Sequence, residues 1–215
     1  MTNSLNVSAG IMTRSTGEEI ANAIIHGLGF GVAIAGLSML VIKARGALAN
    51  TSCALFASSL ILMFLSSTLY HSLAKTKAKK VFQVLDHSAI YFLIAGTYTP
   101  FCLLGLRGAW GWSLFGVEWA MALAGIALHA VNIKSLKKIE VVVYLVMGWA
   151  VIVSWWKLSQ NAPFITLAFL IAGGLCYTLG TLWYRQKNKP GAHIVWHVFV
   201  LLGAICHWWS VWFLV

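Results

Sequence analysis

Seven long stretches of apolar residues fill almost the whole chain and restrict its fold more than any other feature. They run over about residues 20–42, 49–74, 81–105, 110–131, 139–156, 163–184 and 192–214. A helix needs about 20 apolar residues to cross the hydrocarbon core of a bilayer, which is roughly the length of each stretch. Because a helix also satisfies its own backbone hydrogen bonds in lipid, the sequence predicts an all-α membrane protein with a bundle of seven transmembrane helices.

The composition indicates the same class of protein. Of the 215 residues, 60% are hydrophobic and only 9% are charged, whereas a soluble domain has about 25% charged residues. We expect a short N-terminal segment, residues 1–19, and then a single transmembrane domain, residues 20–215. The N-terminal segment is polar and lacks the apolar core of a cleavable signal peptide. The cysteines form no CxxC pair and are expected to pack in the core rather than to form disulfides or bind a metal; they are Cys53, Cys102, Cys176 and Cys206.

The charged residues lie mainly in the short connections and predict the orientation of the bundle. With seven spans, the N-terminus and every second connection fall on one side of the membrane. That side carries eleven Lys and Arg residues, which are Arg14, Lys75, Lys77, Lys79, Lys80, Lys134, Lys137, Lys138, Arg185, Lys187 and Lys189. The other side carries four, which are Lys43, Arg45, Arg107 and Lys157. By the positive-inside rule, the N-terminus is cytoplasmic and the C-terminus lies outside.

The chain has a net charge of +10, which favours binding to anionic membrane lipids. Anionic lipid headgroups attract Lys and Arg residues that flank a transmembrane span. We therefore expect membrane lipids as partners, and neither nucleic acid nor a soluble protein. The oligomeric state stays open.

Several ionisable residues lie inside the spans, where each costs about 2.5–3.5 kcal/mol on insertion scales. His71 lies near the end of the second span, with Ser67 four residues earlier on the same helix face. Asp86 lies one to two turns into the third span, and His193 and His197 share one face at the start of the seventh. The topology brings all five residues to the cytoplasmic side at similar depth. The spans that carry them are far apart in sequence.

These residue types suit a metal site. Three histidines hold Zn²⁺ while leaving a fourth position open for water, which is the pattern of catalytic rather than structural zinc. Asp86 would then act as a general base, and Ser67 would orient Asp86, the water or a reaction intermediate. The alternative is that the histidines only form interhelical hydrogen bonds.

Four motifs at these positions resemble the bacterial hemolysin III branch of the progestin and adipoQ receptor family. They are EEIANAIIHGLG, SSTLYHS, LDHSAIYFLIAGTYTPF and HIVWHVFVLLGAICHWW. The resemblance implies seven helices with a cytoplasmic N-terminus and a zinc ion held by His71, His193 and His197, with Asp86 and Ser67 beside it. It also implies a multi-pass protein of the bacterial inner (plasma) membrane. The wider superfamily includes alkaline ceramidases, and the bacterial branch is named for haemolysis and tied to membrane-lipid homeostasis.

Glu19, Asn22 and His26 share one face where the first span begins. The resemblance suggests that they support the zinc ligands from behind. The alternative is that these residues only stabilise the start of the helix, because acidic side chains such as Glu18 and Glu19 are favourable at a helix N-terminus.

Four other polar residues in the spans are expected to lie outside the metal site. His87 points about 100° away from Asp86 and is expected to pack or to lie at the interface. His129, with Asn132, is expected to reach a lipid headgroup. His207 lies ~15 Å deeper than His197 and is excluded from the metal site. Glu118 lies in the middle of the membrane and is expected to be a protonated, hydrogen-bonded acid, with a role in proton or headgroup binding as a further hypothesis.

A proline near the end of the third span is expected to disturb the helix. Pro100, in the GTYTPF stretch, should kink this helix and free a carbonyl that a neighbouring group must satisfy.

The leading functional hypothesis is a zinc-dependent hydrolase of lipid amide or ester bonds, ceramidase-like and acting in membrane-lipid or fluidity homeostasis. One alternative is a non-catalytic sensor or regulator whose zinc is structural. Another is a cytolytic, pore-forming protein, which ranks lowest because the polar residues gather near one surface instead of lining a path across the bilayer. Whether the chain is an enzyme stays open at this point.

Overall fold

The computed structural model describes residues 14–73, 77–131, 136–186 and 188–215, and of residues 136–138 only the backbone. It contains seven helical spans long and apolar enough to cross a membrane, as predicted. The first four contain α1 (Thr16–Lys43), α2 (Ala47–Ser72), α3 (Lys77–Pro100) and α4 (Gly108–Ala130). The fifth is built from α5 (Leu136–Trp149), the 3₁₀ segment η3 (Ala150–Ser154) and α6 (Trp155–Asn161), and the last two are α7 (Phe164–Tyr184) and α8 (Ala192–Leu214).

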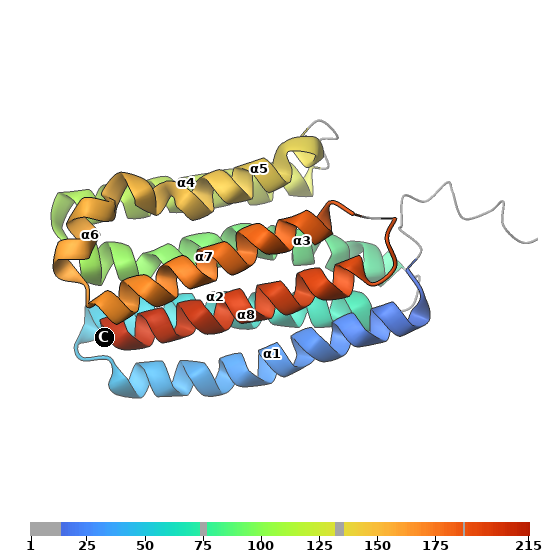
Figure 1. Ribbon diagram of the computed structural model, residues 1–215, viewed down its shortest axis with the longest axis horizontal. Helices are drawn as coiled ribbons and strands as arrows, with labels where there is room; N and C mark the ends of the chain where they lie inside the picture. Colours follow the sequence, from blue (N-terminus) through green and yellow to red (C-terminus); the bar gives the residue numbers. More distant parts are fainter. Residues whose placement is uncertain (1–13, 74–76, 132–135, 187) are drawn as a thin grey trace, which may run out of the picture.

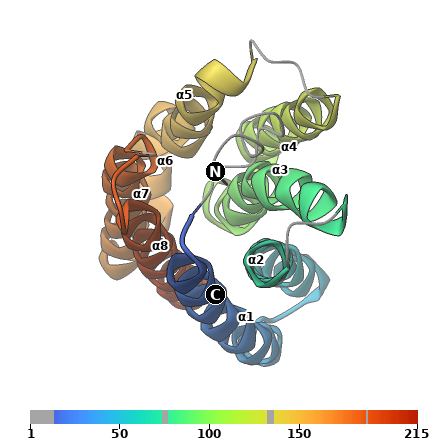
Figure 2. The ribbon, with the colours of Figure 1, turned by 90° about the vertical axis from the view of Figure 1, so that its right-hand side faces the viewer.

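The helices stand in chain order around a ring that α1 and α8 close (Figures 1 and 2). Helices α1 and α8 begin, and α2 ends, at the end of the bundle that faces the viewer in Figure 2. We call this the histidine end, because His71 and His193 lie there. Large apolar side chains such as Leu28, Val32 and Ile42 are exposed on the outside, as expected for a surface that contacts lipid rather than water.

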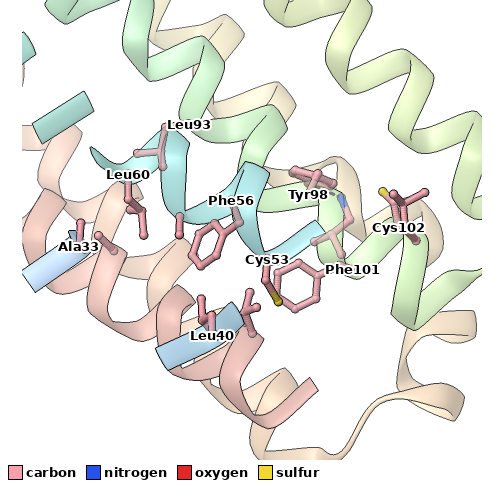
Figure 3. Close-up of a cluster of buried hydrophobic side chains, with 14 of the residues drawn as sticks. Ala33, Leu40, Cys53, Phe56, Leu60, Leu93, Tyr98, Phe101 and Cys102 are labelled. Carbon is pink, nitrogen blue, oxygen red and sulfur yellow. Dashed lines mark hydrogen bonds between the residues drawn. The ribbon is translucent and has the colours of Figure 1, made fainter. Parts of the chain in front are cut away.

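The main core lies between α1, α2, α3 and α8 and is built from tightly packed side chains such as Leu40, Cys53, Phe56 and Phe101 (Figure 3). Helices α2 and α3 approach closely at Gly96, where an added Cβ would lie 2.3 Å from the Ser59 hydroxyl oxygen. Small residues of this kind let helix backbones approach closely in membranes, where packing rather than the hydrophobic effect drives association.

The third span departs from α-helical geometry directly after Pro100. It continues as a six-residue π-helical segment, η2 (Phe101–Leu106), so that the span reaches Leu106. Proline cannot donate a backbone hydrogen bond, and π-helical turns are one way in which a helix absorbs such an interruption.

Three predicted boundaries were several residues short. The third span begins at Lys77 rather than residue 81. The first span begins at Thr16 rather than residue 20, because Ser15 and Glu18 form a capping box that starts the helix early. The fifth span extends to Asn161 rather than residue 156, because α6 continues it after the 3₁₀ segment.

Candidate metal centre

Three histidines from two helices meet at the histidine end. His71 lies in the last turn of α2, and His193 and His197 lie in the first two turns of α8. One ligand nitrogen from each histidine lies within 4.8 Å of the others, a spacing that allows all three to hold one metal ion. The Nε2 atoms of His193 and His197 are 2.9 Å apart. The three side chains that we expected to converge therefore do so.

His71 is oriented by a carboxylate of α1. Its Nδ1 atom lies 2.8 Å from Oε2 of Glu19, which also accepts a 3.1 Å hydrogen bond from Lys79. A carboxylate at this distance favours the tautomer with the proton on Nδ1, which leaves the Nε2 lone pair available to a metal. Nε2 is buried and has no hydrogen-bond partner among the described residues. Such an orphaned nitrogen fits a metal ligand.

Asn22 and His26, the other two residues of α1 that were expected to support the ligands, differ from Glu19. The His26 ring lies 3.9 Å from the His197 ring, centroid to centroid, and meets Phe64 edge-on. Asn22 is fully buried, and its side-chain atoms have no hydrogen-bond partner in the part of the chain that the structure describes. Of the three, only Glu19 hydrogen-bonds a histidine side chain of the cluster.

Asp86 and Ser67 line the same small pocket as His193 and His197. The pocket has a volume of about 60 Å³. The Ser67 hydroxyl is buried and lacks a hydrogen-bond partner within the described ranges, while the Asp86 side chain is 17% exposed. Arg14, from the segment just before α1, also lines this pocket. From the sequence, Arg14 was interpreted only as one of the charges that orient the bundle.

A larger apolar cavity of about 270 Å³ adjoins this pocket. It lies between α3, α5, α7 and α8. Tyr177, Tyr184 and Trp196 line both spaces, so the polar pocket and the apolar cavity share a wall. His207 lines the cavity, and its Nε2 lies 3.2 Å from the Leu170 carbonyl oxygen. It is not among the three clustered histidines, as expected from its depth.

The structure corrects the expectation for His129. Its side chain is buried and its Nδ1 lies 2.8 Å from Oε1 of Glu140, so it does not point to a lipid headgroup. Its ring stacks on His87, which fits the packing role expected for that residue. His87 does not point away from Asp86 as expected, because it lines the same pocket and its Nδ1 lies 4.0 Å from Oδ2 of Asp86. The Tyr144 hydroxyl lies 2.7 Å from Oε1 of Glu140 and 3.0 Å from the His87 carbonyl oxygen, so its single hydrogen is shared between these two acceptors. Asn132 lies outside the described residues.

Sequence reasoning missed Glu140 and Tyr144. Their spacing of four residues places both on one face of α5, but nothing in the sequence showed that this face turns toward α3 and α4. The structure also gives Glu118 no hydrogen-bond partner among the described residues, although it is fully buried. The hydrogen bond expected for this acid is therefore not found there.

The fold and the site define a multi-pass membrane protein with a buried three-histidine cluster able to hold a metal ion. The chain belongs to the haemolysin-III related family, whose profile matches residues 15–208. Hemolysin-3 of Bacillus cereus is 40% identical over 207 residues, which cover 95% of this chain and 94% of that protein. The hemolysin-3 homolog of Bacillus subtilis (strain 168) is 41% identical over 199 residues, covering 91% and 93%.

A more distant relative is the monocyte to macrophage differentiation factor of Homo sapiens. It is 26% identical over 201 residues, which cover 91% of this chain and 83% of that protein. No solved structure matches the chain. Together with the seven spans, the bacterial relatives indicate a multi-pass protein of the inner membrane.

Proposed function

We propose that this protein is a zinc-dependent hydrolase that cleaves amide or ester bonds of membrane lipids at the histidine end of the bundle. The observation that carries the proposal is the juxtaposition of three elements: the histidine cluster, a pocket that contains a carboxylate, and an apolar cavity that shares a wall with this pocket. A lipid substrate needs all three, because it has a polar bond to be cleaved and an acyl chain to be held.

The donor set supports zinc. His71, His193 and His197 would hold the ion through imidazole nitrogens, and imidazole suits Zn²⁺. Three protein ligands leave one coordination position open, as in catalytic zinc sites. When bound, Zn²⁺ supplies Lewis-acid chemistry: it acidifies water and polarises a carbonyl group.

The side chains around the cluster have separate roles in this proposal. Glu19 keeps His71 in the tautomer that presents Nε2 to the metal, and Lys79 donates a hydrogen bond to the same Glu19 oxygen, Oε2. Asp86 accepts the proton from the attacking water and passes it to the leaving group. Ser67 donates its hydroxyl hydrogen to Asp86 or to the oxygen on which negative charge develops.

The apolar cavity is the reason for proposing a lipid as the substrate. Its wall contains aliphatic and aromatic side chains such as Leu93, Ile94 and Trp149, which suit an acyl chain. Tyr177, Tyr184 and Trp196 would contact the chain where it leaves the polar pocket. Burial of the chain places the carbonyl group next to Asp86 and excludes bulk water from the cleft.

The test is a hydrolysis assay on detergent-purified protein with two defined probes, a C18 ceramide and a dioleoyl phosphatidylglycerol. We expect release of oleate or of the ceramide fatty acid, its loss on treatment with a chelator, and its return with Zn²⁺. Absence of release from both probes by zinc-loaded protein would favour the alternative of a regulator with structural zinc. The name Hemolysin-3 describes relatives, and a direct pore would instead be detected as conductance in pure lipid vesicles.

A further inference from the structure

Arg14 is a basic side chain that lines the small pocket beside the histidine cluster, together with Tyr70, Asp86 and His193. We call this space of about 60 Å³ the histidine pocket. The residue is half-buried, although it precedes the first helix. Its guanidinium lies beside the Tyr70 hydroxyl and is close enough to His193 and His197 to interact with them electrostatically. The other described basic residues of this end either pair with Glu19, as Lys79 does, or are exposed, as Lys77, Lys80, Arg185 and Lys189 are.

The chain next to Arg14 is held in place by the start of α1. Ser15 is the N-cap, and its side chain and backbone exchange hydrogen bonds with Glu18. Glu18 also accepts a 2.5 Å hydrogen bond from the backbone N–H of Gly191, which precedes α8. These contacts tie the beginning of α1 to the beginning of α8, which carries two of the clustered histidines. These contacts therefore fix the position of Arg14 beside the pocket.

One nitrogen of the guanidinium lacks a partner. Nη1 is buried, and no acceptor among the described residues hydrogen-bonds to it. Within the described ranges, no carboxylate oxygen lies within 4.0 Å of Arg14, so Asp86 forms no ion pair with it, and Glu18 interacts with it only from a greater distance. Arg14 is only half-buried, but a guanidinium nitrogen withdrawn from water without an acceptor is still unfavourable. Arginine presents several donors in a planar fork that matches a phosphate or a carboxylate.

We propose that Arg14 binds the anionic group of a lipid in the histidine pocket, so that the preferred lipid carries a phosphate or carboxylate close to the bond that reaches the metal. The substrate-class part of this inference rests on the proposed function, whereas the anion-binding part does not.

The test compares Arg14→Gln and Arg14→Lys with Arg185→Gln, an exposed arginine of the same end. Binding to the full-length, zinc-loaded protein in detergent is measured by calorimetry with two matched probes, oleyl phosphate and oleyl alcohol. We expect Arg14→Gln to bind oleyl phosphate roughly tenfold more weakly than wild type, as for loss of a charged hydrogen bond. Arg14→Lys should fall between the two, and Arg185→Gln should match wild type. Oleyl alcohol should bind all four proteins alike.

Equal affinity of wild type and both Arg14 variants for oleyl phosphate would overturn the proposal. The proposal would also be overturned if Arg14→Gln weakened the binding of oleyl alcohol as much as the binding of oleyl phosphate. Arg14 would then only support the structure of the pocket. Inorganic phosphate serves as a third probe: if it displaces oleyl phosphate at similar concentrations, the site binds free phosphate and the lipid assignment is wrong. Because binding is measured without turnover, an absence of hydrolysis would contradict the proposed function and leave this result unaffected.

Discussion

The Nδ1 atom of His71 and the Oε2 atom of Glu19 lie 2.8 Å apart, although 52 positions separate these residues in the chain. This contact joins the end of α2 to the first turn of α1. A carboxylate that accepts the second ring N–H of a ligating histidine fixes the ring and raises its basicity, and its loss typically weakens metal binding 10- to 100-fold. Glu19 thus has a defined structural partner beyond its favourable place at a helix start.

Replacement of Glu19 by Gln should weaken zinc binding about 10- to 100-fold, because the amide cannot match the carboxylate as an acceptor for His71. Competition with a zinc chelator of known affinity measures the change. Glu18→Gln is the matched control, since Glu18 lies in the same turn and caps the helix. It should cost some thermal stability and leave zinc affinity unchanged. Equal zinc affinity in Glu19→Gln and wild type would show that Glu19 acts only at the helix start.

Asp86→Asn should separate metal binding from catalysis. The amide keeps the size of the side chain but cannot accept a proton from water, and general-base catalysis contributes about 10²–10⁴-fold to rate. We therefore expect full zinc content and a loss of hydrolysis of at least about 100-fold in the ceramide and phosphatidylglycerol assays. If the variant keeps its hydrolysis rate, Asp86 is not the base.

The two buried acids Glu140 and Glu118 should respond in opposite ways to replacement by Gln. Glu140 hydrogen-bonds both His129 and Tyr144, so Glu140→Gln should destabilise the protein by about 1–2 kcal/mol. Glu118 has no hydrogen-bond partner among the described residues, and Glu118→Gln should leave stability unchanged or raise it. Thermal unfolding in one detergent measures both. A larger loss for Glu118→Gln than for Glu140→Gln would contradict this description of the two sites.

Much of the fold and of the histidine cluster followed from the sequence, because membrane topology restricts depth. Once the spans are counted, His71, His193 and Asp86 must lie near one membrane surface, and the spacing of four places His193 and His197 on one helix face. The contacts of His129 did not follow in this way. They depend on how α5 turns about its axis, which is set by packing against α3 and α4 and leaves no clear pattern in the apolar sequence of α5.

Arg14 shows a second reason why the site could not be predicted completely from the sequence. In the sequence it is one of many basic residues that flank spans, and charge counting treats these residues alike. Its place in the pocket depends on the capping box at Ser15 and on the contact between Glu18 and Gly191. The capping box is visible in the sequence as S-x-x-E. The contact with Gly191 crosses 173 positions and emerges only when the ring of helices closes.

The central claim is that His71, His193 and His197 hold one zinc ion, and metal content measures it most directly. Protein purified in detergent and resupplied with Zn²⁺ is analysed beside the Ala variant of each histidine, with His207→Ala as a control for loss of a buried histidine in α8. We predict about one zinc per chain in wild type and in His207→Ala, and loss of zinc in the other three variants. Wild-type protein without zinc, or unchanged zinc in the three variants, would contradict the account.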